Sequence, residues 1–173
     1  LVGRLVPENN ALLAINAHRG VKADVPLVIV GEAPYTKAYQ QQLHEAADSR
    51  VVFTGGIYGD DYLTLQANAA CYVAAGEVGG THPALVEAMC VGAAIIASDV
   101  PEHREVLGDT ALFYSPGSET EFAHAVDRVL AEPKLADRLR ASARARADER
   151  YRWHGVVSRY EQLFYAMKAE AAQ

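Results

Sequence analysis

The chain has 173 residues, of which half are hydrophobic and 22% are charged, as in an ordinary folded domain with a core of its own. The formal net charge of -6 argues against a general nucleic-acid-binding protein, so we expect no nucleic-acid partner. The longest apolar run, from Ala88 to Ala97, is far shorter than the roughly 18 residues of a membrane span. Cys71 and Cys90 lie in apolar segments, which favours core thiols in a reducing compartment over a disulfide or a metal site.

Short apolar strands alternate with helices along most of the chain. After a first strand that ends at Leu1-Val2, the expected strands are 26–31, 51–54, 71–74, 93–97 and 111–114, and the expected helices are 8–20, 36–48, 60–68, 83–91, 119–131, 134–150 and 153–171. The β-branched run Leu27-Val28-Ile29-Val30 is typical of a strand buried on both faces. This order predicts an α/β fold, a Rossmann-like, doubly wound parallel sheet with helices on both faces and extra C-terminal helices.

The chain opens at Leu1-Val2-Gly3 without a methionine, at the end of an expected strand. Because chains seldom start inside an element, we expect residues 1–173 to be one domain of a longer protein. Whatever precedes Leu1 would then carry part of the function.

Four turns that contain glycine follow expected strands: Gly3-Arg4, Gly31-Glu32, Gly55-Gly56 and Gly76 to Gly80. In open α/β sheets, ligands bind beyond the carboxyl ends of the strands. Four such turns at one edge indicate that a ligand approaches the backbone closely.

The densest turn leads through Gly79-Gly80 into a helix whose first turn holds Thr81, His82 and Pro83. The exposed N–H groups of a helix start, together with its dipole, form an anion site that a phosphate usually occupies. The segment matches neither the Walker A motif nor the dinucleotide fingerprint, and taken alone its default interpretation is a simple tight turn.

Glu87 is the only formally charged residue between Glu77 and Asp99, on a helix that is otherwise apolar. A helix apolar on all sides is predicted to be buried, and a buried carboxylate needs partners. Glu87 either caps backbone amides of a neighbouring loop or accepts hydrogen bonds from ligand hydroxyls. The second interpretation, beside a phosphate site, predicts a ribose diphosphate: a nucleotide or a nucleotide-sugar.

Each of the other candidate residues has a functional and a structural interpretation. Arg4 is a cation for the diphosphate or a solvated surface residue, and His82 contacts a donor sugar or caps its helix. Glu77 binds sugar hydroxyls or is solvated, and Tyr58 walls a base pocket or belongs to the core. Glu105 is interpreted as a surface acid rather than a ligand-binding residue.

With these residues laid out, the chain resembles the C-terminal, donor-binding half of a retaining B-type glycosyltransferase of family 4 (glycosyl transferases group 1). The most specific match is Leu85-Val86-Glu87-Ala88-Met89, on a helix before a glycine and an apolar strand. The other matching segments are 2–8, 27–31, 51–55, 94–98 and 105–106. Segments 7–10 and 77–83 look most similar to a bacterial branch with rhamnosyltransferases that act on cell-surface polysaccharides.

By position, the resemblance assigns Glu87 to the donor ribose, Arg4 to the diphosphate, and the backbone of 79–81 to the phosphate and sugar. It assigns the turn from Gly55 to Tyr58 to the base. The donor-binding set that we predict comprises Gly3, Arg4, Gly31, Gly55, Gly56, Tyr58, Gly79, Gly80, Thr81, His82, Leu85 and Glu87, with Arg4, Glu77 and Glu87 as the catalytic residues.

Two positions depart from the family pattern. The family usually has a glutamate eight positions before the equivalent of Glu87, where this chain has Gly79. The nearest acid is Glu77, ten positions away. The family also commonly has a lysine where this chain has Asn9, which leaves the diphosphate charge to Arg4 and the helix dipole.

The resemblance implies a domain that binds a nucleoside diphosphate sugar for transfer of a hexosyl group to a hydroxyl acceptor, with retention of configuration and without a metal or other cofactor. An N-terminal domain absent from this chain would bind the acceptor, so we expect the isolated chain to turn over little or nothing. The alternatives are a non-catalytic nucleotide or sugar-phosphate binding module and a nucleotide-sugar epimerase of the same fold.

The late helices carry nine basic residues between Arg128 and Arg159. Interleaved acids such as Asp137 and Asp148 make a solvated helix face the usual interpretation. Peripheral contact with an anionic membrane surface is the alternative, which would place a cytoplasmic protein at the inner face of the membrane.

Overall fold

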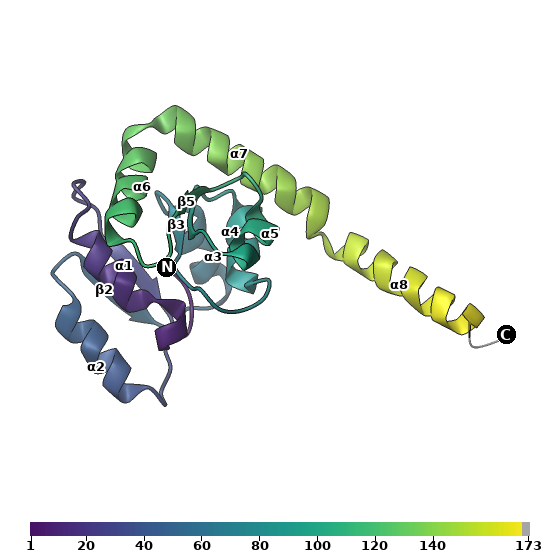
Figure 1. The fold of residues 1–173 in the computed structure, drawn as a ribbon, viewed down its shortest axis with the longest axis horizontal. Coiled ribbons are helices and arrows are strands. Elements are labelled where there is room, and N and C mark those ends of the chain that lie inside the picture. The colour runs from purple at the N-terminus through teal and green to yellow at the C-terminus, as the bar shows by residue number, and fades with distance from the viewer. Residues whose placement is uncertain (171–173) are drawn as a thin grey trace.

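The computed structural model describes residues 1–170 and confirms the alternation of strands and helices (Figure 1). The elements are η1 (Pro7–Asn9), α1 (Ala11–His18), β1 (Leu27–Val30), α2 (Lys37–Ala46), β2 (Val51–Gly55), α3 (Gly59–Ala67), β3 (Tyr72–Ala74), α4 (Pro83–Val91), β4 (Ile95–Ser98), α5 (Pro101–Leu107), β5 (Leu112–Tyr114), α6 (Glu119–Ala131), α7 (Pro133–Arg150) and α8 (Trp153–Glu170). The sequence reasoning missed α5, and the expected end of the last helix at residue 171 lies outside the described residues.

All strand pairings are parallel, as expected, but the strands form two sheets. β1 pairs with β2, and β3, β4 and β5 lie in that order in the second sheet. The expected first strand is reduced to one bridge, Val2 with Val30. An apolar cavity of about 340 Å³ is lined by residues of both sheets, among them Val28 of β1 and Val73 of β3. Val2 also lines it, so the turn that follows Val2 starts at the junction of the two sheets.

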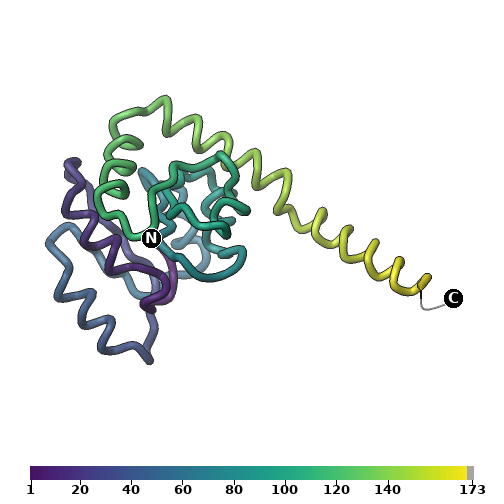
Figure 2. Tube along the Cα trace, viewed as in Figure 1, coloured from purple at the N-terminus to yellow at the C-terminus, as the bar shows by residue number. Residues whose placement is uncertain are grey.

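Helices surround the strands (Figure 2), and the buried hydrophobic residues form two core clusters, the first of which joins both sheets through residues such as Ile96 of β4. In the first core, Ile29 of β1 and Phe122 of α6 are fully buried, and α1 packs against α6. In the second core, Met89 of α4 and Ile95 of β4 are fully buried, and α4 packs against α7. The loop after β3 and the start of α4 therefore rest on a packed layer.

The apolar helix α4 is not buried on all sides. Leu85, Ala88 and Met89 face the core, whereas Pro83, Glu87 and Cys90 are exposed. The three exposed residues lie at i, i+4 and i+7 and so form one outward stripe. The predicted burial of Glu87 is therefore wrong, and Cys90 is a surface cysteine rather than a core thiol.

The two last helices differ in their contacts. α7 buries residues such as Leu139 and Ala143, and Arg146 donates hydrogen bonds to the carbonyl oxygens of Val106 and Glu105. Part of the basic face thus anchors α7 to the body instead of being solvated. α8 has no buried residue and extends away from the body (Figure 1).

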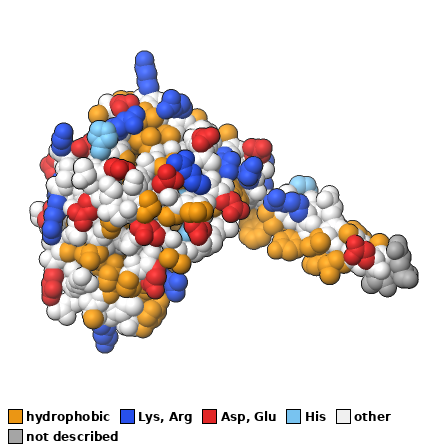
Figure 3. Space-filling model, viewed as in Figure 1, with side chains coloured by type: hydrophobic (Ala, Val, Ile, Leu, Met, Phe, Trp, Pro, Cys, Tyr) orange, Lys and Arg blue, Asp and Glu red, His pale blue; other side chains and the backbone are white. Residues whose placement is uncertain are grey.

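Hydrophobic side chains gather along one side of α8 (Figure 3). Among residues 1–170, no helix combines the length and the apolarity that crossing a bilayer requires.

Candidate functional site

The loop between β3 and α4 presents backbone donors that no protein group uses. The N–H groups of Gly79, Gly80 and Thr81 donate to no acceptor among residues 1–170. His82 then caps α4 with φ = 49°, in the left-handed region that a residue with a side chain rarely adopts. These free N–H groups immediately precede the start of α4, where the positive end of a helix dipole favours an anion.

Contacts with the first turns of the chain fix the base of this loop. The Asn10 side chain donates to the Ala75 carbonyl oxygen (3.2 Å), and the Glu77 N–H donates to the Glu8 carbonyl oxygen (3.4 Å). Sequence segments 8–10 and 75–77 therefore lie side by side at the carboxyl edge of β3.

A cavity of about 430 Å³ opens between this loop and the turn that follows Val2. It brings together seven of the predicted donor-binding residues, namely Gly3, Arg4, Gly79, Gly80, Thr81, His82 and Leu85, and adds Asn9 and His103. The remaining predicted residues, Gly31, Gly55, Gly56, Tyr58, Glu77 and Glu87, do not line it.

Arg4 supplies the positive charge of the cavity. Its side chain is exposed, and one guanidinium nitrogen donates to the Tyr35 hydroxyl at 3.3 Å. Asn9 donates to the Arg4 carbonyl oxygen at 2.7 Å and so fixes the turn. Within residues 1–170 Arg4 forms no ion pair, which leaves its charge available to an anion.

His103 completes the inner wall and is held by Ser98 behind it, and the sequence reasoning did not identify either as a site residue. His103 is only 1% exposed. Its Nδ1 lies 3.0 Å from Ser98 Oγ and 2.9 Å from the Ser98 carbonyl oxygen. Ser98 Oγ in turn donates to the Gly76 carbonyl oxygen at 2.8 Å. Burial is the main cause that lowers the pKa of His103, and neighbouring His82, with ring centroids 5.3 Å apart, adds to it.

Residues 1–146 match the family model of glycosyl transferases group 1. The chain belongs to this family.

An uncharacterized glycosyltransferase of the archaeon Methanocaldococcus jannaschii is 22% identical over 94% of this chain and 43% of its own length. Among solved structures, Anabaena HepE in complex with UDP-glucose has a TM-score of 0.84 at 21% identity, covering 97% of this chain and 48% of that one. Sucrose-phosphate synthase of Thermosynechococcus elongatus has a TM-score of 0.84 at 23% identity, covering 98% and 45%. The chain thus spans about half the length of these relatives, and it has the fold of a Rossmann-like half of a B-type glycosyltransferase with C-terminal helices.

Glu87, the most specific residue of the family pattern, lies on α4 outside the cavity. Its Oε2 accepts a hydrogen bond from the Tyr62 hydroxyl of α3 at 2.8 Å, and Gln66 donates to the same hydroxyl at 3.1 Å. Burial, followed by the Glu87 carboxylate, raises the pKa of Tyr62, so the hydroxyl stays protonated and donates. The expected backbone-capping alternative is not what the structure has, since the partner is a side chain and the carboxylate remains exposed.

Gly31 and Gly55 act through the backbone rather than from the cavity wall. Gly31 adopts φ = 135°, and a Cβ on it would collide with the carbonyl oxygen of Gly3. The Gly31 N–H also donates to the Gly55 carbonyl oxygen at 2.8 Å. In this glycosyltransferase chain Gly31 therefore allows the turn of Gly3 and Arg4 to pack directly on the end of β1.

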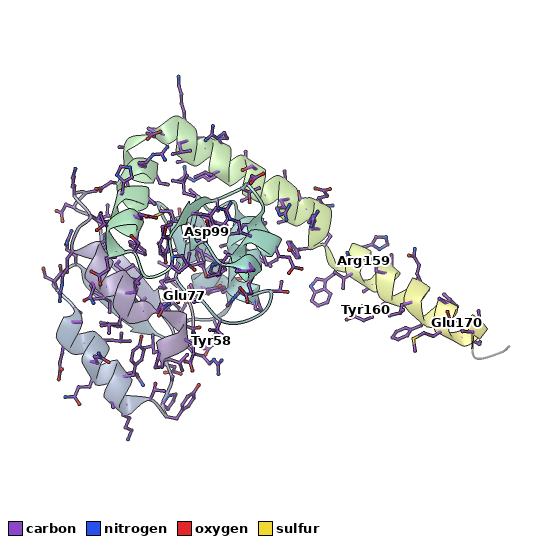
Figure 4. The ribbon with its side chains drawn as sticks, in the orientation of Figure 1. Tyr58, Glu77, Asp99, Arg159, Tyr160 and Glu170 are labelled. Carbon is purple, nitrogen blue, oxygen red and sulfur yellow. The ribbon has the colours of Figure 1, made fainter. Side chains whose placement is uncertain are left out.

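Tyr58 and Glu77 do not line the cavity, and both lie on the body of the molecule rather than on α8 (Figure 4). Tyr58 precedes α3 and is 80% exposed, which contradicts the core alternative for this aromatic residue. Its ring lies over Gly56, where a Cβ would meet the Tyr58 hydroxyl oxygen at 3.0 Å. Glu77 is half-buried at the base of the glycine loop.

Among residues 1–170 no group of three or more His, Cys, Asp or Glu side chains is arranged to hold a metal ion. The expectation that the chain works without a metal stays a prediction.

Proposed function

We propose that this chain is the donor-binding half of a retaining glycosyltransferase that transfers a hexosyl group from a nucleoside diphosphate sugar to a hydroxyl acceptor. The observation that carries the proposal is one cavity lined both by Arg4 and by Gly79, Gly80 and Thr81, whose N–H groups have no acceptor among residues 1–170. Free N–H dipoles and a guanidinium in one cavity suit a diphosphate. Family membership and the solved relatives that hold UDP or UDP-glucose support this choice of ligand.

These groups would also stabilise the leaving group. In the transfer, the bond between the anomeric carbon and the phosphate oxygen breaks, and the acceptor oxygen bonds to the same carbon while losing its proton. Negative charge then develops on the departing diphosphate. Donors fixed before the reaction stabilise that charge without reorganising, and Arg4 adds a full positive charge at the open side.

The other residues take their roles from their places around the cavity. Glu87, one oxygen of which is bonded to Tyr62, is proposed to accept hydrogen bonds from the ribose hydroxyls beside α3. Tyr58 at the start of α3 is proposed to cover the base, and Glu77 to reach sugar hydroxyls. In this proposal the diphosphate lies in the cavity, and the nucleoside extends from it toward the surface between α3 and α4.

The acceptor is proposed to bind a second domain of a longer protein, because this chain spans about half of each relative described above. We further propose membership of family 4, without a metal cofactor, in a cytoplasmic enzyme of bacterial cell-surface polysaccharide synthesis. The narrower likeness to rhamnosyltransferases enters here as part of the proposal. The isolated chain should bind the donor without turning it over.

Isothermal titration calorimetry with UDP, GDP and dTDP, in buffer containing EDTA, tests the proposal directly. We expect one nucleoside diphosphate to bind one-to-one, and Glu87→Gln to weaken it about tenfold because the carboxylate accepts charge-assisted hydrogen bonds. Glu105→Gln, an exposed acid on α5 outside the cavity, is the matched control. If none of the three nucleotides binds, the proposed function is wrong.

The same titrations separate the two alternatives. Binding of inorganic phosphate or glucose 1-phosphate with the same affinity as a nucleoside diphosphate would favour a non-catalytic phosphate-binding module. An epimerase would convert the sugar of the nucleotide-sugar, so product analysis by NMR with the full-length protein distinguishes it from a transferase.

A further inference from the structure

The hydrogen bonds around His103 determine which of its ring nitrogens carries the proton. The Ser98 carbonyl oxygen can only accept, so the Nδ1 that lies 2.9 Å from it must be protonated. Ser98 Oγ, 3.0 Å from the same nitrogen, has a single hydrogen, which it donates to the Gly76 carbonyl oxygen. Oγ therefore accepts from Nδ1 as well, and the whole chain of bonds agrees with one tautomer.

The other ring nitrogen, Nε2, is left as an acceptor. In a neutral imidazole with the proton on Nδ1, Nε2 carries a lone pair and no hydrogen. His103 lines the cavity, and among residues 1–170 the hydrogen bonds of its ring all involve Nδ1, so no protein group uses Nε2. An acceptor in a residue that lines a cavity, unused by any protein group, is available to a hydrogen-bond donor of a ligand.

We propose that His103 Nε2 accepts a hydrogen bond from a hydroxyl of the donor's hexosyl group, and that Ser98 positions it. The inference rests on the proposed function and extends it to a residue outside the segments that carry the family resemblance. A phosphate cannot supply this bond at neutral pH, because its ionised oxygens only accept. The cavity thus offers donors to the diphosphate at the glycine loop and an acceptor to the sugar at its inner wall.

The position of His103 also links sugar binding to the phosphate site. Ser98 bonds both to the imidazole and to Gly76, the first residue of the glycine run. A sugar hydroxyl bound by Nε2 would therefore be held at a fixed position relative to the glycine loop, which binds the diphosphate in this proposal. This is the arrangement that would distinguish a nucleotide-sugar from the bare nucleotide.

The test measures the affinity ratio between a sugar nucleotide and its nucleotide, using UDP-glucose with UDP, GDP-mannose with GDP, and dTDP-rhamnose with dTDP. His103→Asn keeps a donor at the place of Nδ1 and removes Nε2, whereas His103→Gln places an amide oxygen near Nε2. We expect H103N to weaken the sugar nucleotide about 5- to 10-fold with the bare nucleotide unchanged. H103Q should keep more of the wild-type preference for the sugar nucleotide over the bare nucleotide than H103N does.

His18→Asn is the matched control, since His18 is equally buried at 4% exposure but lines the other cavity, where its Nε2 bonds to the Val25 carbonyl oxygen. It should leave the affinity ratio unchanged whatever it does to stability. Long-range ¹H–¹⁵N spectra of the wild type should show an unprotonated Nε2 signal for His103 that moves toward the hydrogen-bonded range on adding sugar nucleotide but not nucleotide.

The outcomes separate the two proposals. If no nucleotide binds, the proposed function fails, and this assignment fails with it. If nucleotides bind but the wild-type ratio is one, or H103N leaves the ratio intact, only the role of His103 is overturned. Loss of bare-nucleotide affinity in H103N, with a proton on Nε2 in the bound state, would instead make His103 a phosphate contact and also overturn it.

Discussion

The two sides of the cavity at the glycine loop are built differently. On the inner side, Leu85, Ser98 and His103 are buried, and Ser98 and His103 are tied to the loop by hydrogen bonds. On the outer side, Arg4 and Thr81 are exposed, with one side-chain bond from Arg4 to Tyr35. The inner side is therefore part of the folded core and sets the shape of the cavity, while the outer side supplies charge and can adjust to a ligand. Substitutions on the inner side should therefore mainly lower stability, whereas substitutions on the outer side should mainly weaken ligand binding.

The largest expected effect comes from Gly31→Ala. Gly31 packs against the backbone of Gly3, which precedes Arg4 on the outer side of the cavity. A Cβ on Gly31 would collide with the Gly3 backbone, which has no flexible end that can yield. We expect a loss of more than about 3 kcal/mol in the free energy of unfolding in urea. Gly59→Ala, also at positive φ but with nothing within 4 Å, should cost only about 1 kcal/mol. Equal losses in the two variants would refute the close packing of Gly3 on Gly31.

The inner side should respond to Leu85→Ala. This side chain is 1% exposed in the second core, so its truncation leaves a cavity and should lower the free energy of unfolding by about 3 kcal/mol. Thr81→Ala, four residues earlier on the exposed loop, should change it by less than about 0.5 kcal/mol. Comparable unfolding midpoints for both variants would contradict the contrast between the two sides.

The outer side should respond in binding. Arg4→Ala should weaken the nucleoside diphosphate about tenfold, because a charge-assisted hydrogen bond is lost, with the unfolding midpoint unchanged. The salt dependence of binding should also become shallower. Arg159→Ala, on α8 far from the cavity (Figure 4), deletes the same charge as a control. An R4A variant that binds like R159A would remove Arg4 from the site.

The smallest effect concerns pH. Burial lowers the pKa of both His18 and His103 below the ordinary value of 6.5, so the unfolded chain binds more protons than the folded one in this range. The free energy of unfolding should therefore fall as the pH decreases from 7 through about 6.5 and below. Denaturant titrations between pH 7.5 and 5.5 should show this slope, and it should be smaller in H103N. A slope of the opposite sign would mean that the buried imidazoles are charged.

Much of the fold was predictable because its strands are short, continuous apolar runs such as the one around Ile29, and because helices such as α4 and α6 end next to a glycine or a proline. Helix α5 escaped prediction because Pro101 and three charged residues make the segment look like a surface loop. Only the i, i+3, i+4 spacing of His103, Val106 and Leu107, which the structure buries, carries a helical signal there.

The candidate site was predictable in its backbone and less so in its side chains. The Gly79-Gly80-Thr81 loop and Arg4 meet as expected, because carboxyl ends of parallel strands share one edge. The burial of Glu87 was wrong because composition does not say which face of α4 has a neighbour. His103 was missed because its importance depends on Ser98, a residue of another element, and on a carbonyl group that no sequence pattern reveals.

The exposed side of α8 has a practical consequence. Its large apolar residues recur at alternating steps of four and three, namely Trp153, Val157, Tyr160, Phe164 and Met167, each more than half exposed. An exposed hydrophobic surface of this kind favours self-association of the protein as its concentration rises. Purified material should therefore sediment faster in concentrated than in dilute solution, and paired lysine replacements at Tyr160 and Phe164 should abolish that dependence while leaving the nucleotide titrations as they were.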